Sequence, residues 1–202
     1  MKFFHLSLLV ALQHVVFAGG CFWGMQAVFN ELRGASAVAG YAGGSAATAH
    51  YEMVETGQTG HAESVDVAYD PSVISFKKLL DVYFLVAHDP TQLNRQGPDE
   101  GTQYRSEIFY TTNAQRDEAK AEIAALQQRR VFSDPIVTQL APLKGFYRAE
   151  DYHQDYVAHN PYAPYVVIND KPKLSHLRRE FPQLLRTQQH AYVRQSIGSA
   201  RR

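Results

Sequence analysis

Strand-like and helix-like segments alternate along this chain, and that alternation restricts its fold more than any other feature. Apolar alternation and β-branched runs predict strands at residues 14–19, 36–44, 62–70, 105–111 and 135–142. Helical spacing of apolar residues, with Ser75 and Thr112 as capping residues, predicts helices at 22–32, 76–88, 113–130, 146–159 and 173–181. Segments of both kinds in this order predict an α+β fold, a two-layer sandwich in which helices cover a mixed β-sheet.

The chain has room for one domain with a sizeable core. Its 202 residues, 45% of them hydrophobic, are too few for two full domains. We predict a folded domain at residues 14–185, an extension before it at 1–13 and a basic, poorly ordered tail after it at 186–202. Within the domain, residues 89–104 are polar and rich in turn formers. They predict a long loop, and long loops in compact domains are often functional.

Charge and cysteine content exclude several classes of protein. Twenty basic residues balance twenty acidic ones, which gives no reason to expect a nucleic-acid partner. The only cysteine is Cys21, so no intrachain disulfide forms, and this favours a reducing compartment such as the cytoplasm. The apolar run within residues 1–18 has the alternative interpretation of an export signal, although His5, Gln13 and His14 interrupt it. The run is too short and too polar to span a membrane.

The segment FAGGCFWGM, residues 17–25, contains the only cysteine and the only tryptophan. Cys21 stands where a predicted strand meets a predicted helix, near unpaired N–H groups and the positive end of the helix dipole. This placement favours a thiolate, the nucleophilic form of cysteine. The flanking glycines let a ligand approach the backbone, and Trp23 offers it an apolar ring. We therefore predict a reactive Cys21, against the common alternative of an inert buried cysteine.

Five ordered blocks carry the residues best suited to chemistry. They are GGCFWGMQAVF at 19–29, GYAGG at 40–44, TGHAESVDVAYDPSVISF at 59–76, HDPTQLNRQGPDEGTQYRSEIFY at 88–110 and AEDYHQDYVAHNP at 149–161. These blocks resemble the A-type peptide methionine sulfoxide reductases, and the resemblance makes residues 14–185 similar to the catalytic domain of that family. It implies thiol-dependent reduction of methionine S-sulfoxide, in proteins and as the free amino acid, and repair of oxidative damage.

The resemblance also implies roles for single residues. It makes Cys21 the nucleophile and Glu63 the acid that protonates the sulfoxide oxygen. A carboxylic acid donates near neutral pH only if its surroundings raise its pKa, so we predict a protonated Glu63 in the free enzyme. His153 matches a histidine of the last block, and we interpret it as a satisfied core histidine. The implied substrate-binding residues are Phe22, Trp23, Tyr51, Asp99 and Tyr104.

The chain departs from many family members because it has no second cysteine. Those members form a disulfide with a C-terminal resolving cysteine, whereas residues 162–202 contain no thiol. Attack by Cys21 leaves a sulfenic acid, which an external thiol must reduce: thioredoxin, glutaredoxin or a small thiol. The resemblance implies no cofactor.

Other functions remain as alternatives. A cysteine hydrolase or acyl transferase would pair Cys21 with a histidine base, but no local histidine pattern supports it and Trp23 has no role in acyl transfer. In a non-catalytic binder of oxidised methionine, Cys21 and Glu63 would have no chemical role. His153 and His159 lack a metal-ligand spacing, so we predict no metal site.

Overall fold

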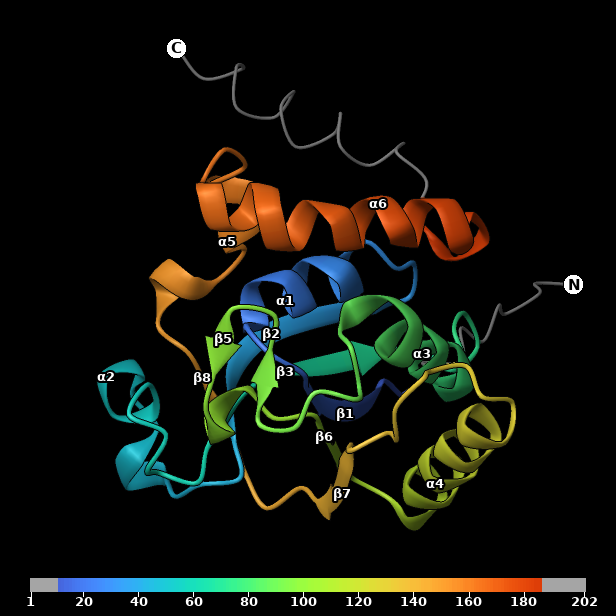
Figure 1. The fold of residues 1–202 in the computed structure, drawn as a ribbon, viewed down its shortest axis with the longest axis horizontal. Helices are drawn as coiled ribbons and strands as arrows, with labels where there is room; N and C mark the ends of the chain where they lie inside the picture. Colours follow the sequence, from blue (N-terminus) through green and yellow to red (C-terminus); the bar gives the residue numbers. More distant parts are fainter. Residues whose placement is uncertain (1–10, 187–202) are drawn as a thin grey trace, which may run out of the picture.

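A six-stranded sheet forms the centre of the computed structural model, which describes residues 11–186 (Figure 1). The strands stand in the order β7-β6-β1-β3-β2-β8. All neighbours pair antiparallel except β6 and β7, which run parallel, so the predicted mixed sheet is confirmed. The strands are β1 (Gln13–Ala18), β2 (Ala35–Ala42), β3 (Ala62–Tyr69), β6 (Glu107–Tyr110), β7 (Gln139–Pro142) and β8 (Phe146–Arg148).

Helices cover one face of the sheet and complete the predicted α+β fold (Figure 1). The helix α1 lies on β2 and β3, and α6 crosses over the outside of α1. The main core fills the space between sheet and helices, where the rings of Phe17 and Phe29 stack. The helices are α1 (Phe22–Asn30), α2 (Tyr51–Val54), α3 (Phe76–Val82), α4 (Asn113–Gln128), α5 (Tyr156–His159) and α6 (Lys171–Glu180).

The central strand β1 is buried on both faces. Val15 and Phe17 point into the main core, whereas Val16 and Ala18 join a smaller apolar cluster on the opposite face. Because side chains alternate along a strand, an unbroken apolar run such as VVFA supplies both faces at once. This burial fixes β1 firmly in the middle of the sheet.

The register of the sheet brings the cysteine turn next to β3. Because β1 and β3 are antiparallel, Ala18 at the end of β1 pairs with Ser64 near the start of β3. Glu63 comes just before Ser64 and pairs with Tyr41 of β2 on its other side. The carboxyl group of Glu63 is thereby carried to the turn that follows β1.

Two helices begin at the predicted caps. Ser75 Oγ accepts a hydrogen bond from the Lys78 N–H (3.3 Å) at the start of α3, and Thr112 Oγ1 accepts one from the Gln115 N–H (3.2 Å) at the start of α4. Helix α3 continues into a wider helical turn over Tyr83–Ala87. Capping residues therefore located these helix starts correctly.

The predicted helix at residues 146–159 is wrong. Its first part is the strand β8, which pairs with β2, and only Tyr156–His159 form an α-helix, α5. Asp155 stands between them with a φ of 52°, and this left-handed conformation interrupts a right-handed helix. The Asp155 N–H donates to Gln26 Oε1 (2.8 Å) on α1. Contacts with the sheet and α1 thus override the helical pattern.

The predicted loop at residues 89–104 contains a short ribbon. Two antiparallel pairs join β4 (Arg95–Gln96) to β5 (Asp99–Glu100). The Gln96 side chain ties the ribbon to the start of the loop, because its amide accepts from the Asp89 N–H (3.0 Å) and donates to the Asp89 carbonyl (3.0 Å). The loop is therefore held in one position rather than left free.

The predicted extension and tail fall mostly outside the described residues. Residues 1–10 and 187–202 are not described, so the boundaries at 1–13 and 186–202 stay predictions. Strand β1 begins at Gln13, and the Arg186 N–H donates to the Glu31 carbonyl (2.9 Å). Within residues 11–186, no helix has the length and apolar character needed to cross a membrane.

Substitution of Gly40 tests whether close pairing of β2 with β8 stabilises the fold. A Cβ at Gly40 would lie closer to the Tyr147 carbonyl oxygen and the Phe146 ring than van der Waals contact allows. Because backbone of the paired strand must then shift, Gly40→Ala should lower the free energy of unfolding by about 2 kcal/mol in urea denaturation. Val38→Ala, at an exposed position of β2, should change it by less than about 0.5 kcal/mol. Equal effects of the two substitutions would contradict this account.

Candidate active site

The cysteine turn is a tight connection between β1 and α1. Cys21 is the residue that precedes the first helical residue of α1, as the sequence predicts. Gly20 adopts a φ of 93°, and a Cβ there would strike the side chain of Gln96. A Cβ at Gly19 would lie 2.7 Å from the His88 ring. The turn therefore needs both glycines, since the 88–104 segment packs directly on its backbone.

All seven predicted site residues converge on one cavity of about 170 Å³. They come from the start of α1, from α2 and β3, and from the loop that carries the β4–β5 ribbon. The eighth lining residue, Tyr165, was missed by the sequence analysis; its only signal was the tyrosine-rich stretch after the last block. The cavity is lined by Cys21, Phe22, Trp23, Tyr51, Glu63, Asp99, Tyr104 and Tyr165.

A larger groove of about 420 Å³ lies on the other side of Trp23, between α1, α5 and α6. It contains no thiol, and both of its cations are engaged: Arg178 pairs with Glu31 (2.7 Å), and the Lys171 ammonium lies over the Tyr162 ring. The smaller cavity is the better candidate for chemistry, because it alone combines the sulfur with carboxyl and hydroxyl groups.

Glu63 is a buried acid that faces the cysteine turn. Its Oε2 accepts a hydrogen bond from the Phe22 N–H (3.0 Å), and its side chain is only 4% exposed. Burial raises the pKa of Glu63 from 4.5 to about 8, although hydrogen bonds from the Phe22 N–H and the Cys21 thiol oppose the shift. At neutral pH the carboxyl group therefore holds a proton that it can donate.

The protonation state of Cys21 differs from the thiolate that its position predicts. Its backbone position is as predicted, and a hydrogen bond from the Trp23 N–H lowers the thiol pKa. Burial outweighs this effect, and the nearby carboxyl groups of Glu63, Asp170 and Asp99 add to it, so the pKa of Cys21 stands well above its usual value. Loss of water around the sulfur is thus stronger than the field of the helix end, and the resting sulfur is a neutral thiol.

Hydroxyl groups complete the polar side of the cavity. Burial is the main cause that raises the pKa of Tyr51 to about 12 and also raises the pKa of Tyr104, so both phenols stay protonated and able to donate. The Tyr165 hydroxyl donates to Asp99 Oδ2, which fixes the carboxylate at the edge of the cavity. The Tyr51 N–H in turn donates to Glu150 Oε1 (3.0 Å), which anchors the start of α2.

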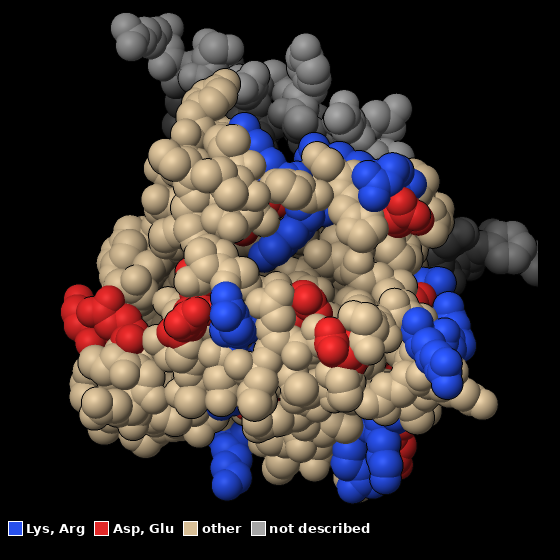
Figure 2. Space-filling model, in the orientation of Figure 1, with Lys and Arg blue, Asp and Glu red and all other residues tan. Residues whose placement is uncertain are grey.

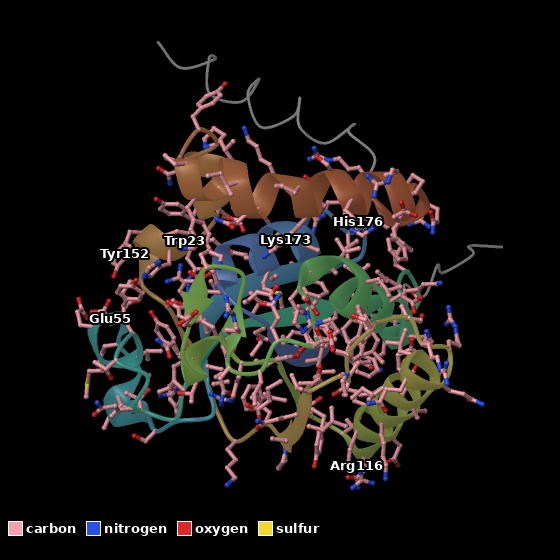
Figure 3. All side chains as sticks on the ribbon, viewed as in Figure 1. Trp23, Glu55, Arg116, Tyr152, Lys173 and His176 are labelled. Carbon is pink, nitrogen blue, oxygen red and sulfur yellow. The ribbon has the colours of Figure 1, made fainter. Side chains whose placement is uncertain are left out.

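Trp23 is held by three aromatic neighbours. Its ring stacks on Tyr156 with centroids 3.7 Å apart and meets the edge of Tyr165 at 5.7 Å. Its Nε1–H donates to His153 Nδ1 (3.0 Å). Figure 3 shows Trp23 at the edge of α1, facing the segment that carries Tyr152. The indole therefore forms a rigid wall, and its partners Tyr156 and Tyr165 were not predicted from the sequence.

His153 is a buried core histidine, as interpreted from the sequence, but it is only half satisfied. Nδ1 is bonded to Trp23, whereas Nε2 has no hydrogen-bond partner among residues 11–186. Burial lowers the pKa of His153, which keeps the ring neutral. The other histidine beside the turn, His88, is bonded to Ser106 (2.7 Å) and to the Tyr83 carbonyl (3.0 Å). Because His153 Nδ1 accepts from Trp23, its Nε2 carries the ring proton and cannot take one from Cys21, and both nitrogens of His88 are bonded. Neither ring therefore offers the base that a cysteine hydrolase needs.

A metal centre has no basis in the described part of the chain. Across residues 11–186, no three His, Cys, Asp or Glu side chains are grouped closely enough to hold an ion. The cavity itself is lined by sulfur, carboxyl, phenol and apolar aromatic groups.

Known proteins with similar sequence and structure share this architecture. The family model "peptide methionine sulfoxide reductase" matches residues 13–185. Peptide methionine sulfoxide reductase MsrA 2 of Mesorhizobium japonicum is 54% identical over 84% of this chain and 87% of its own. Mxr1 from Saccharomyces cerevisiae in reduced form superposes with a TM-score of 0.70, at 34% identity over 77% of this chain and 90% of that one. Mxr1 in complex with Trx2 gives a TM-score of 0.50, at 26% identity over 74% and 87%. The chain accordingly belongs to the peptide methionine sulfoxide reductase family.

Proposed function

We propose that this reductase acts on the S epimer of methionine sulfoxide, in proteins and as the free amino acid, with Cys21 as the nucleophile. One observation carries the proposal: the thiol shares a cavity with a buried carboxyl group that is protonated at neutral pH. A sulfoxide has an electrophilic sulfur, a basic oxygen and a methyl group, and the cavity offers a partner for each. The sulfur of Cys21, the acid Glu63 and the rings of Phe22 and Trp23 are those partners.

The chemical step transfers the oxygen from substrate to enzyme. Cys21 Sγ attacks the sulfoxide sulfur while the Glu63 proton moves to the oxygen, and the thiol proton replaces it on the carboxylate. The S–O bond of the substrate then breaks, methionine leaves, and the oxygen ends on Cys21 as a sulfenic acid. The substrate sulfur gains two electrons and the Cys21 sulfur loses two, so protons and electrons balance.

The polar side of the cavity accounts for release of the product. Burial of one methyl group contributes only about 0.8 kcal/mol, whereas an unpaired buried polar group costs about 1–3 kcal/mol. Methionine fills the aromatic wall but has no oxygen for Tyr51, Tyr104 and Glu63, so the site favours the sulfoxide. Because methyl group, oxygen and line of attack are all fixed, only one epimer of the chiral sulfur fits.

Regeneration of Cys21 relies on external thiols. The chain has no other cysteine, so a first thiol attacks the sulfenic acid, releases water and leaves a mixed disulfide on Cys21. A second thiol resolves that disulfide and restores the Cys21 thiol. The yeast structure with Trx2 supports a thioredoxin in this role, with glutaredoxin or a small thiol as the other donors. A cytoplasmic location, which keeps a lone thiol reduced, belongs to the same proposal.

An assay with separated epimers tests the proposal. Methionine S-sulfoxide and R-sulfoxide are supplied with dithiothreitol, thioredoxin or glutaredoxin, and methionine is quantified. We expect methionine from the S epimer with dithiothreitol and with at least one protein donor, and none above background from the R epimer. Equal rates for the two epimers, or no methionine from the S epimer with any donor, would overturn the proposal.

A further inference from the structure

Asp170 is a buried acid that the reaction described above does not use. Its exposed fraction is zero, and neither carboxylate oxygen has a hydrogen-bond partner among residues 11–186. The nearest cation is Lys173, one helical turn along α6, whose Nζ lies 3.8 Å from Asp170 Oδ1. A buried carboxylate without hydrogen bonds is costly, so a structure that keeps one calls for a physical reason.

The pair lies against the first turn of α1. A Cβ built on Gly24 would overlap Asp170 Oδ1 and would lie 3.1 Å from Lys173 Nζ. Gly24 belongs to the same helical turn as Trp23 and follows closely on Cys21. Figure 3 shows Lys173 reaching from α6 toward α1, and Figure 2 shows Lys and Arg side chains in a hollow at the same place. The missing Cβ of Gly24 thus leaves room for both charged groups against the first turn of α1, close in sequence to Cys21.

Three carboxyl groups act on the Cys21 sulfur. The carboxyl groups of Glu63, Asp170 and Asp99 each raise the pKa of the Cys21 thiol, after the larger effect of burial. Lys173 is the cation beside these groups: it lowers the pKa of Asp170 and of Asp99. A positive charge favours the anionic form of a neighbouring group, so at a nearby sulfur it opposes the effect of the carboxylates.

Three further facts define the surroundings of the pair. Burial raises the pKa of Asp170 to about 6, with Lys173 opposing and Asp99 adding, so at pH 8 the carboxylate is charged and balances the ammonium. The charge of Asp170 also contributes to the raised pKa of Tyr165 on the neighbouring segment. The pKa of His88 is lowered to about 4, mainly by burial and in part by Lys173. Removing either member of the pair changes the charge against the first turn of α1 by one unit.

We propose that Asp170 and Lys173 are positioning residues of the active site: the carboxylate holds the ammonium against the first turn of α1, and the pair sets the electrostatic potential at the Cys21 sulfur. The inference rests on the proposed nucleophilic role of Cys21. It assigns neither residue a contact with substrate. Its consequence is that the two members act in opposite directions on the reactivity of the same atom.

Alkylation of Cys21 measures that reactivity directly. The chain has a single cysteine, so the rate of iodoacetamide addition, followed by intact mass from pH 7 to 10, reports on this sulfur alone. Lys173→Met should slow alkylation at pH 8 by about tenfold, and Asp170→Asn should speed it by about tenfold, because a neighbouring charge shifts a pKa by about one unit. Lys173→Arg, which keeps the charge, should restore the rate.

Lys171→Met is the matched control. Lys171 lies on the same helix, but its ammonium sits over the Tyr162 ring, 5.1 Å from the centroid. This variant should alkylate like the wild type. Shifts of the same sign in Lys173→Met and Asp170→Asn, or a shift in Lys171→Met as large as in Lys173→Met, would overturn the proposal.

Two further measurements distinguish an electrostatic effect on Cys21 from misfolding of a variant and from a failure of the proposed function. Thermal melting identifies a variant that does not fold. If Asp170→Asn is that variant, the comparison of Lys173→Met with Lys173→Arg decides, and equal rates for these two overturn the proposal. Opposite shifts in a protein that fails the sulfoxide assay would reject the proposed function and keep the electrostatic role of the pair.

Discussion

Cys21→Ser should reduce the formation of methionine from methionine S-sulfoxide to the uncatalysed background, a loss on the order of 10⁶-fold. A serine hydroxyl is a much weaker nucleophile than a thiol toward a soft sulfur, and the chain contains no second thiol to replace it. Methionine is quantified by chromatography over hours with dithiothreitol in excess. A rate within tenfold of the wild type would mean that the oxygen is removed by another group.

The wild-type protein supplies the complementary measurement. One turnover without reductant should add one oxygen to the mass of the chain and release one methionine per chain, and a dimedone-type probe should trap the sulfenic acid on Cys21. Cys21→Ser should add no mass under the same conditions. Serine is close to cysteine in size, so the variant should melt within a few degrees of the wild type, which keeps the loss of activity apart from a loss of fold.

Glu63→Gln should lower kcat by about 10²–10⁴-fold, because glutamine cannot supply the proton that the departing oxygen needs. The amide still accepts from the Phe22 N–H, so the geometry of the turn is kept. Wild-type kcat should fall as the pH rises past about 8, where Glu63 loses its proton, whereas the small residual rate of the variant should lack this fall. A variant with wild-type kcat at pH 7 would remove Glu63 from the mechanism.

The same substitution should stabilise the protein. The pKa of Glu63 is raised from 4.5 to about 8 in the folded chain, so between these values the folded state keeps a proton that the unfolded state releases. Stability contributed by this group is therefore present below pH 4.5 and is lost as the pH rises through 8. Glutamine has no such loss, and at pH 9 the variant should be more stable by on the order of a few kcal/mol.

Urea denaturation at pH 5 and pH 9 measures this difference. The gain in the free energy of unfolding for Glu63→Gln should be small at pH 5 and large at pH 9. A variant that is less stable than the wild type at pH 9 would show that the carboxylate is paired, not isolated, in the folded chain. Activity and stability are thus expected to move in opposite directions at one position.

The sequence correctly predicted those elements that depend on residues close together in the chain. The strand before Cys21, the start of α1 and the caps Ser75 and Thr112 follow from residues within a few positions of one another. The family resemblance brought in the seven cavity residues, six of them inside the five blocks and Tyr51 outside them. Nothing local in the sequence places Asp99 beside Cys21. Their assembly depends on the register of β1 with β3, which no single segment encodes.

Predictions from the sequence were wrong or missing where contacts between distant segments determine the structure. Residues 146–159 have a helical pattern, yet pairing of β8 with β2 and the hydrogen bond from Asp155 to Gln26 divide them. The predicted thiolate failed for a similar reason: the helix end is visible in the sequence, but the burial that outweighs it is not. Asp170 carried no signal at all, because only the approach of α6 to Gly24 gives it a place near the sulfur.

The neutral thiol has a consequence for a protein whose work begins under oxidative stress. Peroxides oxidise thiolates far faster than thiols, and they do so most readily at exposed sulfurs. Cys21 is 7% exposed and its pKa is raised, so the idle enzyme presents little to hydrogen peroxide. The thiol is therefore protected from oxidants in the resting protein, and by the proposed mechanism its sulfur is oxidised only when an oxidised methionine side chain fills the cavity.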